Sequence, residues 1–371
     1  MNVLEKILLL GLCVHHGLLA QTEQKPQSGP PPTPFSTLVR ENFDRWDHNH
    51  DGQLTTPELD LNVLNPHIRG DAAAALAELK SVQRYNADDH KQTPPLTLDA
   101  LAQYELAIKR HKRVEHDYDE NFRLLKSKLD QVSRQLFPDK LPRLTSIHQG
   151  DLGDCYFLSM VGALASQRPH TIVEMIKDNA DGTYSVKFPG AKLVTIKAPT
   201  DTEISLGSTA GSDGLWVVVL EKAFGKLANI HRRPGRKKKE VTDVIAHGGS
   251  TDETIPLLTS HSCDGVDKQL GVALEKAFAH HRLVSTSPEE GREPPELYSS
   301  HVYAVIGFDF QKKVVTVYDC DPEEFTPKGP PGLKNGYPFK DGVFTMPLHE
   351  FIYVFKSVNI ENNENAKARF E

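Results

Sequence analysis

A single cysteine stands between a glycine-containing turn and an apolar run in the segment IHQGDLGDCYFLSMVGALA, residues 147–165. The run predicts a buried helix that begins at Cys155. At the first turn of a helix, free backbone N–H groups and the helix dipole favour the thiolate over the thiol. Gln149 stands six residues earlier, where its side-chain amide and the Cys155 N–H would together bind an oxyanion. This pattern is typical of a nucleophilic cysteine with an oxyanion hole.

Oxygen-bearing side chains gather in a second segment, DHNHDGQLTTPE, residues 47–58. They occupy positions 1, 3, 5, 9 and 12, Gly52 stands at position 6, and Gln53 at position 7 would offer its backbone carbonyl. A hard divalent cation needs about six or seven oxygens, and this spacing wraps them around one point. The segment therefore resembles an EF-hand loop and predicts one Ca²⁺. The expected ligands are Asp47, Asn49, Asp51, Gln53, Thr55 and Glu58.

EF-hands usually occur in pairs, so a partner loop is expected downstream. Leu54 at position 8 would bond to that loop, and a segment beginning near Asp89 would place Leu96 at the matching position. Lys91 and Pro94 stand where ligands or glycine belong, so the partner is predicted to be degenerate and free of metal.

The cysteine segment carries a longer signature. QGDLGDCYFLS, residues 149–159, resembles the active-site signature of the calpain-type cysteine proteases, Q-G-x-x-G-D-C-[WY]-F-L. LWVVVLEKAFGKLA, residues 215–228, is similar to a helix of that family, and HVYAVIGFD, residues 301–309, to its histidine strand. The resemblance extends over about residues 139–361. It implies an α+β, papain-like core with a helical lobe that carries Cys155 and a β-rich lobe that carries the general base, His301.

The residue that orients the histidine differs from the family pattern. The family uses Asn in an N-P-W-G stretch after a strand, whereas this chain reads VTVYDCDPEEF. An ungapped alignment places Asp319 at the Asn position and Cys320 at the Pro position. A carboxylate can accept the imidazole N–H and hold its tautomer. Asp321 stays open as an alternative, because a shift of two residues keeps the same face of the strand.

The resemblance implies a calcium-linked cysteine endopeptidase that acts on a protein or peptide and forms an acyl-enzyme. Two alternatives stay open. Transglutaminases use a Cys–His–Asp set, so Asp319 also fits acyl transfer on the same fold. The altered stretch after the strand also fits a catalytically impaired, calcium-dependent binding protein.

Composition restricts the class of partner. The 371 residues suggest two or three domains, and 38% apolar and 25% charged residues fit a globular protein. A net charge of −7 argues against a nucleic-acid binder. The histidines show neither H-E-x-x-H nor H-x-x-E-H spacing, so we predict no zinc site. The basic run HRRPGRKKKE, residues 231–240, reads as a solvated loop, and the sequence gives no oligomeric state.

The first 20 residues resemble a signal peptide, so the protein is predicted to be secreted or periplasmic without stable membrane insertion. Three cysteines would remain, and a Cys263–Cys320 disulfide is possible. The predicted division is a signal peptide at 1–20, a Pro-rich linker at 21–34, an EF-hand region at 35–110, an amphipathic linker helix at 111–138, the cysteine lobe at 139–265, the histidine and Asp319 lobe at 266–361, and a polar tail at 362–371.

Apolar spacing predicts the elements that position these residues. Helices are expected at 35–46, 72–85, 97–136, 214–228 and 267–281, a hairpin around Pro189, two strands within 301–319, and a strand, a helix and a strand within 341–361.

Overall fold

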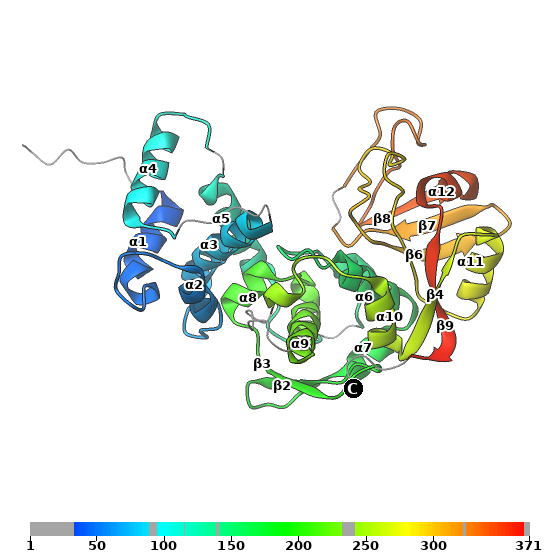
Figure 1. Ribbon diagram of the computed structural model, residues 1–371, viewed down its shortest axis with the longest axis horizontal. Coiled ribbons are helices and arrows are strands. Elements are labelled where there is room, and N and C mark those ends of the chain that lie inside the picture. Colours follow the sequence, from blue (N-terminus) through cyan, green and yellow to red (C-terminus); the bar gives the residue numbers. More distant parts are fainter. Residues whose placement is uncertain are drawn as a thin grey trace, which may run out of the picture.

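The computed structural model describes residues 33–366 except for 89–94, 115, 139–140, 232–241 and 322–323. The predicted signal peptide, nearly all of the Pro-rich linker, the first residues of the proposed partner loop and most of the basic run lie outside the described residues. Figure 1 shows three parts side by side: a group of N-terminal helices, a central part of helices with a small sheet, and a part built on a larger sheet. No helix among the described residues combines the length and the apolarity needed to cross a membrane.

The N-terminal part packs its helices around one apolar cluster. Its elements are α1 (Pro34–Trp46), α2 (Thr56–Val63), α3 (Gly70–Asp88), α4 (Leu98–Lys109) and α5 (Tyr118–Gln131). α1 begins where predicted because the Thr33 hydroxyl accepts the Ser36 N–H at 3.2 Å, which caps the helix. Phe35, Phe43 and Trp46 then face the cluster. The helix predicted within α3 is also present.

The predicted continuous helix over 97–136, and with it the linker helix at 111–138, is wrong. α4 and α5 are separate helices, and α5 ends at residue 131. The second helix starts afresh because the Asp117 side chain accepts the N–H groups of Asp119 and Glu120. The apolar stripe begins at Val114, ahead of α5, so periodicity alone does not place the start of this helix.

The central part surrounds one buried helix. Its elements are η1 (Leu144–Ser146), α6 (Cys155–Gln167), α7 (Pro169–Met175), β1 (Ile176–Asp178), β2 (Thr183–Val186), β3 (Val194–Lys197), α8 (Asp201–Leu206), η2 (Gly211–Asp213), α9 (Trp216–Ile230), η3 (Thr242–Val244) and α10 (Thr251–Thr259). Every residue of α6 from Cys155 to Ala165 is buried, as its apolar run predicts. The predicted hairpin is confirmed, because β2 pairs antiparallel with β3.

The larger sheet forms the third part. Its elements are β4 (His261–Val266), α11 (Leu270–Ala279), β5 (Val284–Thr286), β6 (Tyr303–Asp309), β7 (Val314–Tyr318), β8 (Val343–Pro347), α12 (Leu348–Phe355) and β9 (Val358–Asn365). The strand order is β4-β9-β5-β6-β7-β8, and all neighbours are antiparallel. The strands and helices predicted within 267–361 are confirmed. The predicted lobe boundary after residue 265 is wrong, because it cuts β4 away from the sheet in which it pairs with β9.

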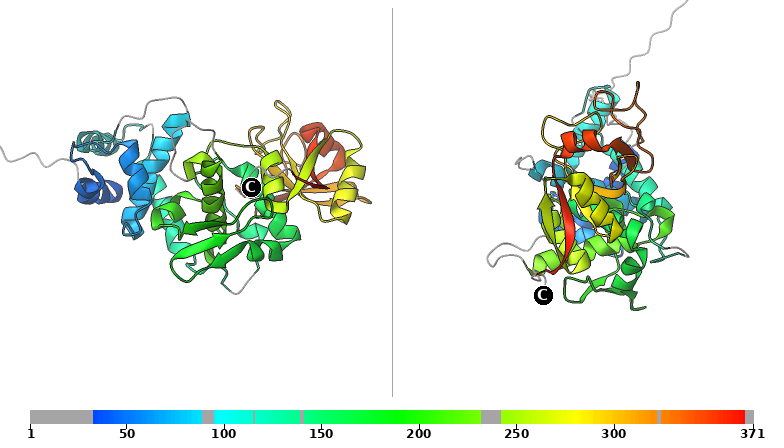
Figure 2. Two further views of the ribbon diagram at one scale, coloured as in Figure 1. Left: turned by 60° about the horizontal axis from the view of Figure 1, so that its bottom comes forward. Right: turned by 90° about the vertical axis from the view of Figure 1, so that its right-hand side faces the viewer.

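Buried ion pairs attach the N-terminal helices to the central part, which lie against each other in Figure 2. Lys80 of α3 is fully buried, and its Nζ lies 2.5 Å from Asp60 of α2 and 2.8 Å from Asp243 of η3. Arg84 Nε contacts the same Asp243 at 2.6 Å. Removing one partner of such a buried pair costs about 3–5 kcal/mol, so α2, α3 and η3 are held together firmly.

Candidate active site

Two glycines bring the chain into the turn that ends at Cys155. A Cβ on Gly150 would lie 2.2 Å from the carbonyl oxygen of Gly207, and a Cβ on Gly153 would lie 2.6 Å from that of Ala246. The Gly153 N–H donates to the same Ala246 carbonyl at 3.0 Å. Only glycine allows so close an approach of two backbones, which explains the glycine spacing in QGDLGDC. The turn delivers Cys155 as the first residue of α6.

Cys155 and His301 shift each other's pKa in opposite directions. Burial raises the pKa of the Cys155 thiol, but the hydrogen bond and the charge of His301 outweigh it, so the net pKa is lowered. Burial lowers the pKa of His301, but hydrogen bonds to Asp319 and Cys155 outweigh it, so the net pKa is raised. A thiol with a lowered pKa beside an imidazole with a raised pKa favours a thiolate–imidazolium pair.

His301 is held on its other side by Asp319. The His301 Nε2 and Asp319 Oδ1 atoms are 2.8 Å apart, so Nδ1 is the ring nitrogen left to face Cys155. The same Oδ1 accepts the backbone N–H of Asp321 at 2.9 Å. The structure thus brings Asp319 to the histidine, whereas Asp321 supports that carboxylate through its backbone. The ring of Tyr303 packs edge-on against His301, with centroids 5.0 Å apart.

Gln149 fastens the glycine turn to the segment after β7. Its backbone N–H donates to the Cys320 carbonyl at 2.9 Å. Its side-chain Nε2 donates to the Leu152 carbonyl at 2.5 Å, which fixes the orientation of the amide. An amide nitrogen carries a second N–H, which has no partner among the described residues and is available to donate a hydrogen bond.

Residues 113–318 match the model of the calpain family cysteine proteases, and this segment is more than half of the 371-residue chain. The chain belongs to the calpain family of cysteine proteases. The match includes Cys155 and His301 and ends at Tyr318, directly before Asp319. Membership of this family supports cysteine-type peptidase activity on a peptide substrate. No curated protein matches the chain.

This calpain-family site contains a second thiol, to which the sequence assigns only a structural role. Cys320 is fully buried, and its Sγ lies 3.4 Å from Gln149 Oε1, 3.6 Å from Ser159 Oγ and 4.0 Å from His301 Nε2. Burial raises the pKa of Cys320 to about 12. The cysteines of the described chain are free thiols, so the possible disulfide between Cys263 and Cys320 is not formed. The position of Cys320 directly after Asp319 was the one signal in the sequence for its contact with His301.

A pair of buried carboxyls next to Cys155 is a feature that the sequence did not predict. Asp154 directly precedes Cys155, and Glu221 of α9 lies against it; both side chains are fully buried. Burial raises the pKa of both groups, and that of Asp154 lies well above its ordinary value. Neither carboxylate oxygen of Asp154 has a hydrogen-bond partner among the described residues, so burial and the neighbouring Glu221 both favour its protonated form. A protonated Asp154 places no negative charge beside Cys155.

The proposed calcium loop joins α1 to α2. Gly52 has a φ of +80°, in the left-handed region that glycine adopts freely, as the sharp turn at position 6 requires. The carboxylate of Asp47 accepts the N–H groups of Asp51 and Gly52 at 3.3 and 2.8 Å. Glu58 Oε2 accepts the Thr55 N–H at 2.9 Å. The other predicted ligands, Asn49 and Gln53, lie on the same loop.

The donor chemistry of this loop fits a hard cation. Asp47 and Glu58 are 3% and 5% exposed, and neither forms an ion pair with a described residue. Buried carboxylates without a positive partner are costly, and Ca²⁺ would neutralise them. The carboxylates of Asp47, Asp51 and Glu58 are not all within 4.8 Å of one another in the described structure. At least one of these carboxylates would have to move for all three to contact one Ca²⁺.

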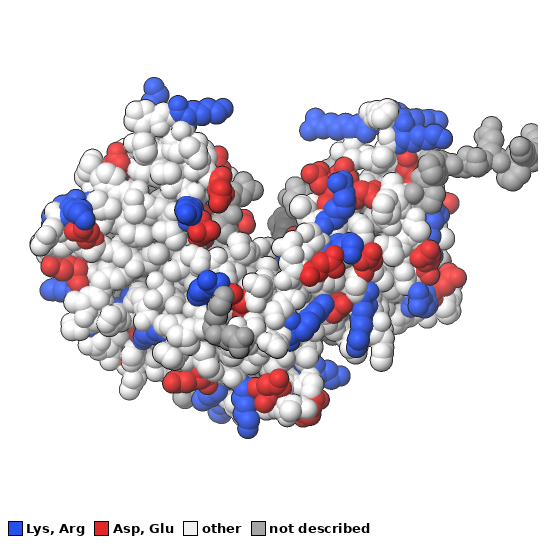
Figure 3. All heavy atoms as spheres, turned by 180° about the vertical axis from the view of Figure 1, so that it is seen from behind, with Lys and Arg blue, Asp and Glu red and all other residues white. Residues whose placement is uncertain are grey.

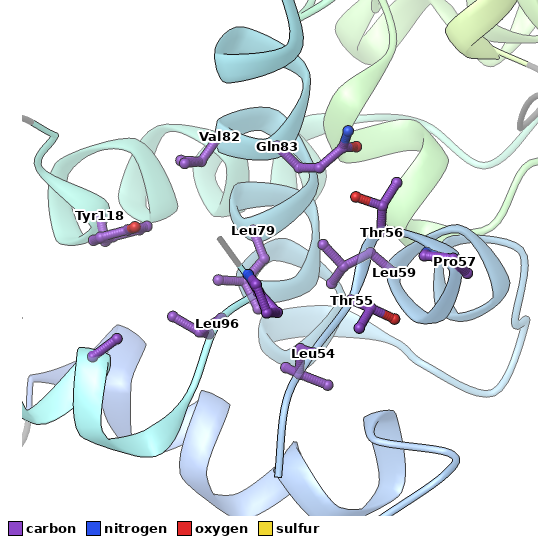
Figure 4. Close-up of a pocket in the computed structure, with 12 residues that line it drawn as sticks. Leu54, Thr55, Thr56, Pro57, Leu59, Leu79, Val82, Gln83, Leu96 and Tyr118 are labelled. Atoms are coloured by element: carbon purple, nitrogen blue, oxygen red, sulfur yellow. The ribbon is translucent and has the colours of Figure 1, made fainter. Parts of the chain in front are cut away.

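The loop also makes the contact expected of a paired EF-hand. Leu54 and Leu96 exchange two backbone hydrogen bonds, at 2.8 and 3.1 Å, although residues 89–94 of the partner segment lie outside the described residues. A largely apolar pocket of about 400 Å³ lies beside this pair, as Figure 4 shows. It is lined by Leu54, Thr55, Thr56, Pro57, Leu59, Leu79, Val82, Gln83, Pro95, Leu96, Ala100 and Tyr118.

Proposed function

We propose that this chain is an endopeptidase in which Cys155 is the nucleophile, His301 the general base and Asp319 the residue that orients the histidine. The observation that carries the proposal is the linear order of contacts at the start of α6. His301 interacts with the thiol on one side and lies 2.8 Å from Asp319 on the other. Nucleophile, base and orienting group in this order form a catalytic triad.

The mechanism follows from these positions. The Cys155 thiolate attacks the scissile carbonyl carbon, and the oxygen takes up negative charge beside the Gln149 amide and the Cys155 N–H. His301 donates its proton to the leaving amine, which yields an acyl-enzyme. Water then attacks the acyl carbon while His301 accepts its proton, and the thiolate leaves. Asp319 stabilises the imidazolium in each step and keeps Nδ1 toward the sulfur.

We also propose that the two sheets and their helices form the two lobes of a papain-like core, with the peptide bound between them. Separate apolar clusters lie around α6 and within the larger sheet, which is the packing expected of two lobes. Figure 3 shows the molecule hollowed between the part that carries the larger sheet and the N-terminal helices, and on this face charges of both signs are interspersed.

A thiol-directed peptide electrophile tests the enzyme proposal. We expect it to label Cys155, as located by mass spectrometry of the digested protein, and to leave Cys263 unlabelled. Burial and the neighbouring Asp252 raise the pKa of Cys263 to about 12, so that thiol is a matched internal control. Absence of labelling with and without Ca²⁺ would contradict the proposal. Labelling with peptide crosslinking but no cleavage would favour the transglutaminase-like alternative, for which Asp319 is the supporting observation.

Replacing Asp319 by asparagine is expected to shift the alkaline limb of the kcat/KM profile to lower pH. The Asp319 carboxylate helps to raise the pKa of His301, so the imidazolium persists to higher pH than a free histidine would allow. A neutral amide removes this effect but still accepts the imidazole N–H. The limb should move by about one to three pH units.

Asp319→Ala is the companion variant. It removes the acceptor as well as the charge, so kcat/KM should fall by about 100-fold at every pH, because the ring is no longer held. An alkaline limb that stays in place in Asp319→Asn would contradict the role assigned to the carboxylate.

We further propose that Ca²⁺ binds the 47–58 loop and is linked to activity. The support is the spacing of the donors, the buried carboxylates of Asp47 and Glu58, and the pairing of Leu54 with Leu96. The ion would supply a fixed positive charge that joins the end of α1 to the start of α2. Export remains the sequence-based proposal for residues 1–20.

Glu58→Gln is expected to weaken Ca²⁺ binding by about 100-fold, because the loop loses its last, bidentate carboxylate. Burial raises the pKa of Glu58, but hydrogen bonds from Thr55, Asn49 and His48 outweigh it and lower the net pKa, so the wild-type residue is charged at neutral pH. Glutamine preserves the capping box at the start of α2, so the fold should be retained.

Calorimetric titration with Ca²⁺ measures this change, and Glu41→Gln on the exposed surface of α1 is the control. Equal affinity in the Glu58 variant and the wild type would exclude the 47–58 loop as the site.

A further inference from the structure

Cys320 adds to the candidate active site a thiol that the proposed chemistry does not need. The side chains of His301, Asp319 and Cys320 offer one nitrogen, one oxygen and one sulfur atom, all within 4.8 Å of one another. We propose that these three residues bind a thiophilic divalent cation, with Zn²⁺ as the natural case, and that the bound cation switches the peptidase off. The inhibition rests on the proposed function, whereas the binding does not.

The distances are close to those of a zinc site. His301 Nε2 lies 2.8 Å from Asp319 Oδ1 and 4.0 Å from Cys320 Sγ. In a tetrahedral zinc site, bonds of about 2.0–2.3 Å place neighbouring ligand atoms roughly 3.4–3.6 Å apart. On binding, the distance from His301 Nε2 to Asp319 Oδ1 would lengthen and the distance from His301 Nε2 to Cys320 Sγ would shorten, by roughly half an ångström each. Side-chain rotations are sufficient for changes of this size.

The fold, rather than a sequence motif, assembles this set. Antiparallel pairing of β6 with β7 places the residue before β6 beside the residues after β7. His301 and the Asp319–Cys320 pair are therefore neighbours in space, although they show none of the short zinc spacings. This is why the sequence predicted no zinc site.

The donor chemistry selects the cation. A thiolate with an imidazole and one carboxylate suits Zn²⁺ or Co²⁺ far better than Ca²⁺ or Mg²⁺, which prefer oxygen ligands. On binding, the Cys320 thiol and the His301 Nε2–H each release a proton to solvent, and the cation forms bonds to the sulfur, the nitrogen and the carboxylate oxygen. The fourth position is left for water. Approach is from the His301 side, whose side chain is 16% exposed while Asp319 and Cys320 are buried.

A cation bound to His301, Asp319 and Cys320 would prevent His301 from taking part in catalysis. With a cation on Nε2, the imidazole can no longer donate to Asp319. The cation also opposes the positive charge that His301 carries when it pairs with the Cys155 thiolate. The ring would remain in place but would no longer act as an acid toward the leaving amine.

Binding is tested with Co²⁺ as the probe, because its charge-transfer band with a thiolate reports sulfur ligation without any turnover. The protein used is the full chain carrying Cys155→Ser, which removes the other active-site sulfur. We expect this variant to show the thiolate–Co²⁺ band, and Zn²⁺ to displace the Co²⁺. The double variant Cys155→Ser/Cys320→Ser should lose the band, whereas Cys155→Ser/Cys263→Ser should keep it.

Inhibition is tested on chains that keep Cys155. The Zn²⁺ concentration that halves peptide hydrolysis should rise by about 100-fold or more in Cys320→Ser, since even outer-shell changes cost about 10–100-fold in affinity. Each variant is compared with its own rate in the absence of metal, and Cys263→Ser is the matched control. Equal inhibition of Cys320→Ser and the wild type would overturn the regulatory part of the proposal. A Co²⁺ band that survives the loss of Cys320 would overturn the site itself.

Discussion

Replacing Cys155 by alanine is expected to lower kcat for peptide hydrolysis by about 10⁴- to 10⁶-fold, the range seen when a nucleophile is removed from a catalytic triad. The residue lies at the first turn of α6 and interacts with His301, as the proposed nucleophile must. Substrate contacts are left intact, so binding of a cleavable peptide to the variant should persist. The measurement is kcat and KM with a fluorogenic peptide, together with the affinity of the inactive variant for the same peptide.

Cys263→Ala is the control for this experiment, because it removes a thiol outside the site and should leave kcat unchanged. Cys320 is the residue that makes the experiment informative. If Cys155→Ala retained a rate within about tenfold of the wild type, the second buried thiol, 4.0 Å from His301 Nε2, would become the candidate nucleophile. That outcome would contradict the role assigned to Cys155.

Replacing His301 by alanine is expected to reduce kcat/KM by about 10³- to 10⁵-fold, because the histidine acts twice. It lowers the pKa of the Cys155 thiol by hydrogen bonding and charge, and it donates the proton to the leaving amine. The effect on the Cys155 pKa can be measured separately from hydrolysis, by alkylation of the thiol. The pH at which alkylation of Cys155 reaches half its maximal rate should rise, because only burial, which raises the thiol pKa, is left to compete with two backbone N–H groups.

The control is His349→Ala on the exposed surface of α12, which should leave both the hydrolysis rate and the alkylation profile unchanged. An alkylation profile in His301→Ala that coincides with that of the wild type would show that the thiolate does not depend on this histidine.

Much of the fold could be read from the sequence because local patterns and tertiary packing agree there. The apolar run of α6, the alternating residues of β6 and β7 and the turn between them all point to the elements observed. The break between α4 and α5 could not be read in this way. The capping of α5 by Asp117 is a short polar signal inside an apolar stripe that already begins at Val114.

The residues of the candidate site also fall into those that local sequence predicts and those that depend on tertiary packing. Cys155, His301 and Gln149 follow from a contiguous signature and a recognisable strand. The contact of Cys320 with His301 and the burial of Asp154 against Glu221 do not, since they depend on which side chains meet when α6, α9 and β7 pack together. The choice between Asp319 and Asp321 also needed the structure, because both follow the end of β7 and only the 2.8 Å contact with His301 distinguishes Asp319.

The ion pairs around Lys80 connect the 47–58 loop with the turn that carries Cys155. Glu58 and Asp60 belong to the same helix, α2, and Asp60 binds the fully buried Lys80. Lys80 also binds Asp243, which lies three residues before Ala246. The Ala246 carbonyl in turn accepts the N–H of Gly153, two residues before Cys155.

Separating the Lys80 charge from its partners costs about 3–5 kcal/mol, a large part of the free energy of unfolding of a typical domain. A movement of α2 is therefore not accommodated by exposing Lys80 to water. The network therefore gives α2 a continuous series of polar contacts to the turn before Cys155. Lys80→Met, which keeps the bulk and removes the charge, would break the contacts that join α2 to η3 through this residue.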